Sequence, residues 1–346
     1  MVIGNLTTAA LKRRYPRGTD LTVATITPAQ NKAAARELVS GFSLEMTGKD
    51  VPGLEEAAHA IPQGTKINVT FLGNEDLDMR VTAAKAVKDL GFVPVPHISA
   101  RRLKSQDQLE EFLGRLQEVG ATEHVFAVGG DPTEPEGPYP DSLSVIRTGL
   151  LQKYGVREVS IAGYPEGHPD INNDVLWRHL EDKSASLKEQ GLDAVILTQF
   201  AFDTDPVLTW IKGVRDRGID TQIRIGTPGP AGIKRLLGFA RRFGIGANAM
   251  IVKKYGFSLT NLMGTAGPDK FVTDLSALLA DASTGSATGS TGSATGSTGS
   301  ATGSTGSATG STGSATGYGD VKLHFYTFGG LLATSEWVRE YLAAQA

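Results

Sequence analysis

The chain has 346 residues, of which 40% are hydrophobic and 21% are charged, and its net charge is −3. These values predict a globular protein with a large core in one or two domains, and they give no general attraction to nucleic acid or to an anionic membrane. The absence of cysteine excludes disulfides and thiolate sites, and without a signal-peptide pattern or an apolar run of membrane length we expect a cytoplasmic protein with small-molecule partners.

Residues 1–40 form a predicted N-terminal extension. They include the basic run Lys12–Arg13–Arg14, for which a solvated surface is a more ordinary explanation than a phosphate site. The segment Pro28–Val39 predicts a short helix at the bottom of the domain that follows. We assign residues 41–346 to one catalytic domain.

From Phe42 onward, short β-branched or aromatic runs alternate with longer amphipathic segments. The predicted strands are Phe42–Met46, Lys66–Leu72, Val93–Ile98, His124–Val128, Glu158–Gly163, Ala194–Phe200, Gln222–Gly226 and Lys322–Thr327. The predicted helices are Glu75–Leu90, Asp107–Val119, Asp141–Tyr154, Asp174–Gln190, Asp205–Arg217, Ile233–Phe243, Pro268–Leu279 and Leu331–Ala344. Eight such alternations predict a single (β/α)8 TIM barrel. A doubly wound open sheet is the alternative, although no GxGxxG motif follows the first strand.

Residues 283–317 interrupt this alternation. They are five copies of Ser-Thr-Gly-Ser-Ala-Thr-Gly, without charge and without an apolar side chain larger than alanine. Such a segment cannot bury enough surface to offset the entropy of ordering. We therefore predict a flexible linker before the last strand, at the bottom of the barrel and without chemistry. Its natural or engineered origin is left open.

Glu45 stands at the end of the first predicted strand. In a parallel barrel the carboxyl ends of the strands converge on one mouth, which is where that fold places its chemistry. The alternative for Glu45 is a loop carboxylate that pairs with Lys49.

Other polar residues end the later strands, and these are Thr70, His97, Asp131, Tyr164, His168 and Gln199. Because these polar residues would all face one mouth of the barrel, they predict a catalytic or cofactor site there. The two histidines lack the spacing of a metal site, so no metal is expected.

Taken in order, the strand-end motifs resemble those of the methylenetetrahydrofolate reductase family. The motifs that carry the resemblance are Ser43–Leu44–Glu45, Val69–Thr70–Phe71, Pro96–His97, Gly130–Asp131, Tyr164–Pro165–Glu166–Gly167–His168–Pro169, Thr198–Gln199–Phe200 and His324–Phe325–Tyr326–Thr327. The resemblance implies a barrel that carries FAD and reduces 5,10-methylenetetrahydrofolate to 5-methyltetrahydrofolate with electrons from NADH or NADPH. A folate is then the partner, and the oligomeric state is left open.

The same resemblance implies roles for single residues. Glu45 becomes the general acid that opens the five-membered ring of the folate, and Asp131 lies near the flavin's pyrimidine edge and the pterin. Gln199 contacts the folate and Tyr326 closes the wall of the site. The residues implied for the flavin are Thr70, His97, Tyr164 and His168, with Lys183 or Lys188 facing a phosphate. Ring opening needs an acid that stays protonated near neutral pH, which burial of Glu45 and the charge of Asp131 would favour.

The chain departs from the family's motifs at several positions. Gly129 stands where an arginine often precedes the glycine and aspartate, and Gly329–Gly330 stands where an arginine commonly follows the last strand. Met46–Thr47–Gly48–Lys49 replaces a run of aromatic residues and prolines after the first glutamate. The two missing guanidiniums would have supplied charge for a diphosphate or a glutamate tail.

Two alternatives therefore stay open. One is a folate-binding barrel enzyme without tightly bound flavin, which passes hydride directly from the nicotinamide or transfers a one-carbon group. The other is a non-catalytic folate-binding subunit, against which the retained acids Glu45 and Asp131 argue.

Overall fold

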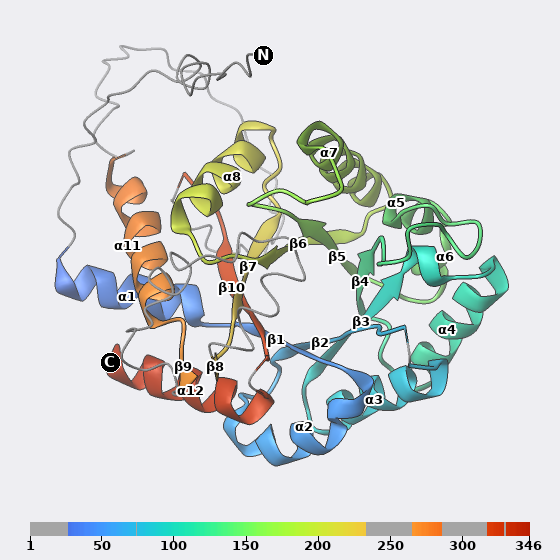
Figure 1. Ribbon diagram of the computed structural model, residues 1–346, viewed down its shortest axis with the longest axis horizontal. Coiled ribbons are helices and arrows are strands. Elements are labelled where there is room, and N and C mark those ends of the chain that lie inside the picture. The colour runs from blue at the N-terminus through green and yellow to red at the C-terminus, as the bar shows by residue number, and fades with distance from the viewer. Residues whose placement is uncertain (1–26, 74, 233–264, 286–316, 329) are drawn as a thin grey trace, which may run out of the picture.

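Eight parallel strands close into one barrel inside a ring of helices (Figure 1). The computed structural model describes residues 27–73, 75–232, 265–285, 317–328 and 330–346. The barrel strands are β1 Ser43–Met46, β2 Lys66–Val69, β3 Val93–Ser99, β4 His124–Val128, β5 Glu158–Gly163, β6 Asp193–Phe200, β7 Gln222–Pro228 and β10 Val321–Tyr326. Their order around the barrel is β1-β10-β7-β6-β5-β4-β3-β2. The predicted (β/α)8 fold is confirmed.

Helices connect successive strands on the outside of the barrel (Figure 1). They are α1 Pro28–Val39, α2 Val51–Ala57, α3 Leu77–Asp89, α4 Gln106–Glu118, α5 Ser142–Ile146, α6 Leu150–Lys153, α7 Asn173–Glu189, α8 Thr204–Asp216, α11 Asp269–Gly285 and α12 Leu331–Ala344, with the short 3-10 turns η1 Gly48–Asp50, η2 Ala58–Ala60 and η3 Ala100–Arg102. None of these described helices is long and apolar enough to cross a lipid bilayer. The predicted helix Ile233–Phe243 lies outside the described residues.

Several predicted boundaries are wrong. The predicted helix Asp141–Tyr154 is two helices, α5 and α6, because Gly149 adopts a φ of 74° that interrupts helical geometry. α11 continues to Gly285, so residues 283–285 of the predicted linker belong to a helix. An existing helix lengthens by a turn far more easily than a new one forms. Residues 286–316 lie outside the described residues.

A small antiparallel sheet joins β8, Ala231–Gly232, to β9, Thr265–Ala266. The sequence did not predict it, because strands of two residues leave no periodic pattern.

The helix α1 has the predicted bounds and lies beside the start of β10. Thr27 and Gln30 form a capping box at its N-terminus. At the other end, Nζ of Lys322 on β10 donates to the carbonyl oxygen of Glu37 at 2.7 Å and also contacts the Glu37 carboxylate. Lys322 is near the amino end of its strand, so this end of α1 lies at the bottom of the barrel. The division into an extension and one domain stays a prediction.

The interior of the barrel is filled in layers. At the bottom, Nζ of Lys66 on β2 lies 2.5 Å from Oε1 of Glu158 on β5, a contact that spans the lumen because β3 and β4 separate these strands. Above it, Val95, Phe126 and Leu197 form an apolar layer that is distinct from the main core under the helices. This packed interior leaves the carboxyl ends of the strands as the place where a site can form.

Candidate active site

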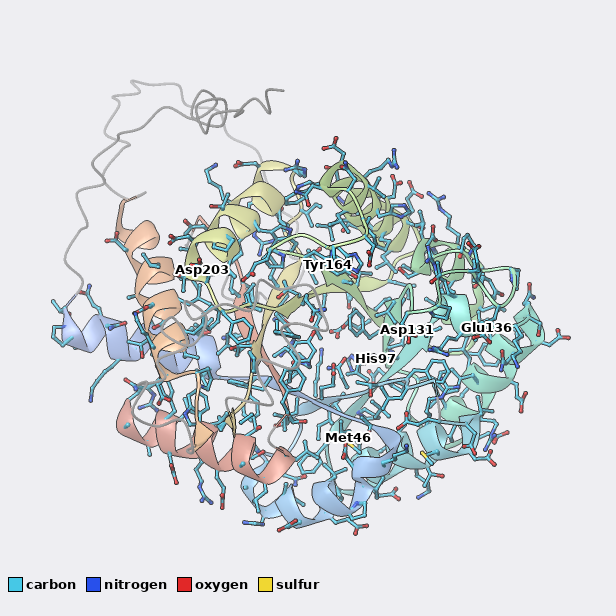
Figure 2. The ribbon with its side chains drawn as sticks, in the orientation of Figure 1. Met46, His97, Asp131, Glu136, Tyr164 and Asp203 are labelled. Carbon is cyan, nitrogen blue, oxygen red and sulfur yellow. The ribbon has the colours of Figure 1, made fainter. Side chains whose placement is uncertain are left out.

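Glu45 lies at the mouth of the barrel between two buried histidines. Its Oε2 atom is 3.5 Å from Nε2 of His324 on β10 and 4.0 Å from Nε2 of His97 on β3. Glu45 makes no described contact with Lys49, so the alternative of a loop ion pair finds no support. Figure 2 labels His97, Asp131 and Tyr164 around the same opening.

Ser43 and His324 extend this cluster below Glu45. Oγ of Ser43 lies 2.9 Å from Nδ1 of His324, and both side chains are completely buried. The two residues are register partners on β1 and β10, and Glu45 follows Ser43 by two positions, on the same face of its strand. The contact with Ser43 therefore fixes the imidazole so that Nε2 faces Glu45.

Sequence reasoning did not select Ser43 or His324 as site residues. The available signal was the period of two along each strand, which places Ser43 with Glu45 and His324 with Tyr326. The contact itself joins residues that are 281 positions apart in the chain. Only closure of the barrel brings them together.

Both histidines are held neutral at neutral pH. Burial lowers the pKa of His97 to about 4; Glu45 opposes this shift and His324 reinforces it. Burial also lowers the pKa of His324, again opposed by Glu45. Burial raises the pKa of Tyr326 well above its usual value, and Glu45 and Tyr164 add to the effect. The carboxyl group of Glu45 thus faces two neutral imidazoles and a protonated phenol.

Several buried polar atoms at this mouth have no hydrogen-bond partner among the described residues. They are Oδ1 of Asn68, Oγ1 of Thr70 and the Nε2 atoms of His97 and His324. The contact between His324 and Glu45 is long for a hydrogen bond at 3.5 Å. Buried polar groups are normally paired. Unpaired polar atoms around one carboxyl group are typical of a site for a ligand with its own hydrogen-bond donors and acceptors.

Aromatic side chains form one wall of the site. Tyr326 packs edge-on against Phe200 at a ring distance of 5.3 Å and stacks on Phe328 at 5.8 Å. The hydroxyl of Tyr326 donates to the carbonyl oxygen of Thr198 at 3.1 Å. Directly after β5, Tyr164 packs edge-on against His168 at 5.4 Å. These rings offer flat surfaces to a planar heterocycle.

Gln199 lies where the pairing of β6 with β7 shifts register, between Leu197 and Phe200. Such irregularities at the rim of a barrel redirect side chains. The Oε1 atom of Gln199 accepts from the backbone N–H of Phe200 at 3.1 Å, and the residue is half-buried. No hydrogen bond of its amide nitrogen to another described residue is found.

Asp131 is not packed against Glu45. Its carboxylate is 72% exposed and pairs with Arg102, whose Nη2 lies 2.6 Å from Oδ1. Because this guanidinium balances the charge of Asp131, any influence of that charge on Glu45 is weakened.

The two candidate lysines lie along α7, and neither has a described contact with Glu45, His97 or Tyr326. Lys183 is buried on the second half of the helix, and this burial lowers the pKa of Lys183 to about 8, opposed by Asp141. Lys188 is exposed in the last turn, at the end of α7 that is remote from the strand exits. The described contacts thus gather Glu45, His97 and Tyr326 but not Asp131 or Lys183. In the described part of the chain, no group of three or more His, Asp or Glu side chains could hold a metal ion.

Comparison with known proteins places the chain in a family. The family model "Methylenetetrahydrofolate reductase" matches residues 42–242. The 5,10-methylenetetrahydrofolate reductase of Pectobacterium carotovorum subsp. carotovorum is 29% identical over 180 residues, which cover 50% of this chain and 57% of the relative. Methylenetetrahydrofolate reductase 1 of Schizosaccharomyces pombe is 31% identical over 148 residues, covering 40% of this chain and 23% of the relative.

A plant relative matches a shorter segment. Methylenetetrahydrofolate reductase (NADH) 1 of Arabidopsis thaliana is 33% identical over 136 residues, which cover 35% of this chain and 22% of the relative. The chain therefore matches less than two thirds of the length of each of these curated relatives.

Proposed function

The chain belongs to the methylenetetrahydrofolate reductase family, and on that premise we propose that its barrel mouth reduces 5,10-methylenetetrahydrofolate to 5-methyltetrahydrofolate. The electrons come from NADH or NADPH, and a relative from Arabidopsis that is named for NADH favours NADH. The observation that carries the proposal is the contact of half-buried Glu45 with His324, which is buried against Ser43, among unpaired polar atoms.

Glu45 supplies the proton that the reaction needs. The methylene carbon accepts hydride only after the imidazolidine ring has opened, and opening requires a proton on the leaving nitrogen. That proton comes from the carboxyl group of Glu45, the C–N bond breaks, and the resulting iminium carbon takes up the hydride to become the methyl group. Neutral His324, fixed by Ser43, faces Glu45 without adding a positive charge that would favour loss of the proton.

The residues at the mouth fit the ring system of a flavin. Thr70 and His97 have unpaired polar atoms for the ring's heteroatoms, and Tyr164 and His168 present aromatic faces. These four residues would hold the ring. A flavin bound there would accept hydride from the nicotinamide and pass it to the folate.

A second candidate function is direct hydride transfer from the nicotinamide, without tightly bound flavin. The observation that favours it is the shortage of cations for the FAD diphosphate in the described part of the mouth. The guanidinium of Arg102 is already paired with Asp131, Lys183 and Lys188 lie along α7, and Gly129 has no side chain. Diphosphate groups in proteins are usually balanced by such cations or by backbone N–H groups.

One assay tests both candidates. The purified protein is incubated without oxygen with 5,10-methylenetetrahydrofolate and either NADH or NADPH, and 5-methyltetrahydrofolate is quantified, while the absorption spectrum of the protein reports bound flavin. Product together with flavin bands supports the first candidate, and product without flavin bands, even after FAD is added, supports the second. Binding of the folate without product, with both donors and with added FAD, would contradict both and indicate a binding subunit.

A further inference from the structure

Arg224 is a buried arginine near the bottom of the barrel that the proposed reaction does not use. It lies on β7 and is 7% exposed. Its register partner on β10 is Lys322, and Gly226, two positions after it, is the register partner of His324. Residues two positions apart share one face of a strand, and His324 faces the lumen because it contacts Glu45. Arg224 is therefore on the lumen face, one layer of residues below His324.

The guanidinium group of Arg224 forms no ion pair within the described part of the chain. Its Nη1 atom donates to the carbonyl oxygen of Gly41 at 2.8 Å, and its Nε atom is buried without a hydrogen-bond partner among the described residues. Burial lowers the pKa of Arg224, and the charges of Glu158 and Asp320 oppose this shift. Both oxygens of Glu158, however, are already held by Nζ of Lys66, at 2.5 Å and 2.7 Å. A buried charge without a close counterion lowers the stability of a fold, which indicates that Arg224 has another role.

The hydrogen bond to Gly41 joins Arg224 to the strand that carries Glu45. Gly41 comes two residues before Ser43, and Ser43 pairs in register with His324. Gly41 and Arg224 therefore lie in the same layer, below Ser43 and His324. Because β10 separates β7 from β1 in the barrel, the Arg224 side chain spans β10 in the layer beneath His324.

The charge of Arg224 acts on His324 from below. Burial lowers the pKa of His324, Glu45 opposes this shift, and Arg224 reinforces it. Lys322, on the same face of β10, directs its Nζ atom to the carbonyl oxygen of Glu37 on α1, at 2.7 Å. The other described neighbours of His324 in the lumen are uncharged at neutral pH, and these are Ser43, His97 and Tyr326. Among the described residues, the charge of His324 thus depends on Glu45 on one side and on Arg224 on the other.

We propose that Arg224 is a positioning residue for the reduction: it anchors the start of β1 and keeps a positive charge beneath His324, so that the imidazole facing Glu45 stays uncharged. A charged His324 would lie 3.5 Å from the carboxyl group of Glu45 and would favour its ionised form, which has no proton to give. Arg224 is one layer further from Glu45, and its own effect there is weaker because Coulomb interactions fall with distance. The inference deepens the proposed function and rests on it.

The test follows the charge of His324 and the rate of 5-methyltetrahydrofolate formation over one range, from about pH 8 to about pH 5.5. The ring nitrogens of isotope-labelled histidine report by NMR whether each imidazole is charged, and the signals that are missing from His324→Gln identify His324. Arg224→Met removes the guanidinium, Arg224→Gln removes the charge but keeps a donor for Gly41, and Arg224→Lys keeps a positive charge.

Arg215→Met is the matched control. Arg215 on α8 also donates to backbone carbonyl oxygens near the start of β10, those of Tyr318 at 2.8 Å, Ile219 at 2.7 Å and Thr221 at 2.8 Å. It is not among the groups that act on His324. Its loss should lower the melting temperature, as the loss of Arg224 should, because carbonyl oxygens lose their donors. It should leave the titration of His324 unchanged.

We expect His324 to take up a proton at a higher pH in Arg224→Met and Arg224→Gln than in wild type, and to titrate in Arg224→Lys and Arg215→Met as it does in wild type. The rates of the two uncharged variants, divided by the wild-type rate, should fall by about three-fold or more from the alkaline to the acidic end of the range. The same ratio for Arg224→Lys and for Arg215→Met should not change with pH.

Three results would overturn the proposal and leave the proposed function standing. If His324 titrates alike in wild type, Arg224→Met and Arg224→Gln, Arg224 does not control its charge. If Arg224→Lys titrates like Arg224→Met, the positive charge at this position has no such role. If His324 titrates as expected but the rate ratios do not change with pH, its charge does not affect the reaction. If wild type forms no 5-methyltetrahydrofolate, the proposed function fails and this inference falls with it.

Discussion

Two buried histidines face one carboxyl group at the mouth of this barrel, and neither imidazole is charged at neutral pH. His324 is fixed by Ser43 and His97 packs edge-on against Phe126 at 4.7 Å, so both rings have a set orientation. A charged imidazole at either place would stabilise the ionised form of Glu45, which is the form that cannot give a proton. In the proposed mechanism, burial of the histidines therefore keeps a positive charge away from Glu45.

This burial predicts a pH dependence of stability. The pKa of His97 is about 4 in the folded protein, against 6.5 for an ordinary histidine. Between these values the unfolded chain binds more protons, so the free energy of unfolding falls as the pH drops below about 6.5, by about 2 kcal/mol at pH 5. Above about pH 6.5 this contribution is fully present.

Urea unfolding of wild type and His97→Asn at about pH 7 and pH 5 measures the effect. The variant keeps a polar side chain that does not titrate, so it should lose less stability than wild type between the two conditions. Equal losses would show that folding does not lower the pKa of His97.

At the scale of elements, the sequence predicts the barrel and its strands but few of the contacts between distant segments. β4 and β5 have the predicted bounds because their apolar runs end at turn residues. β2 stops at Val69 instead of Leu72, since the buried carboxylate of Glu75 accepts from the backbone N–H groups of Leu72 and Gly48 and draws the chain into a turn. That contact depends on a neighbouring loop, which no local pattern shows.

In the candidate site, too, the sequence predicts the residues but not the contacts between distant segments. Glu45, His97 and Tyr326 could be predicted because each lies near the carboxyl end of a strand, and all such ends share one mouth. Their partners could not, because the Ser43–His324 contact depends on the register of β1 against β10 and the Asp131–Arg102 contact on the path of two loops. Local pattern fixes which residues reach the mouth, while tertiary structure fixes which of them touch.

The ion pair at the bottom of the barrel gives a further prediction, because Glu158 on β5 contacts Lys66 on β2, a strand that is not its neighbour. Burial alone would raise the pKa of Glu158, but His124 and Lys66 overcome this and hold the pKa at about 2. Glu158→Gln leaves Lys66 partly buried without its counterion, and we expect a loss of about 2–4 kcal/mol in the free energy of unfolding. Urea unfolding measures it.

Glu123→Gln is the control for Glu158→Gln, because Glu123 pairs with Arg157 at 3.8 Å on the exposed surface. It should change stability by less than about 0.5 kcal/mol. If both variants lose the same free energy of unfolding, the contact between Lys66 and Glu158 stabilises the fold no more than a surface ion pair does.

At the scale of the whole molecule, the candidate active site joins segments from both sides of the seven-residue repeat. Ser43 and Glu45 precede it, His324 and Tyr326 follow it, and β10 completes the barrel between β1 and β7. These four residues therefore come together only when the last strand has closed the barrel.

Shortening the repeat should nevertheless change little. Loop-closure entropy varies only with the logarithm of loop length, so deleting two of the five copies alters stability by less than about 1 kcal/mol. The copies to delete lie within residues 286–316, and melting temperature and turnover are the measurements. A fall of several degrees would show that the repeat packs against the barrel.

The most direct test of the account is the rate of 5-methyltetrahydrofolate formation by Glu45→Gln. Glutamine keeps the size and hydrogen-bonding reach of glutamate but carries no transferable proton, so we predict a rate lower by about 10²–10⁴-fold. The melting temperature and the dissociation constant of 5-methyltetrahydrofolate should stay close to wild type. A variant that forms product at nearly the wild-type rate, or one that loses rate only together with folate affinity and melting temperature, would contradict the assignment of Glu45 as the proton donor.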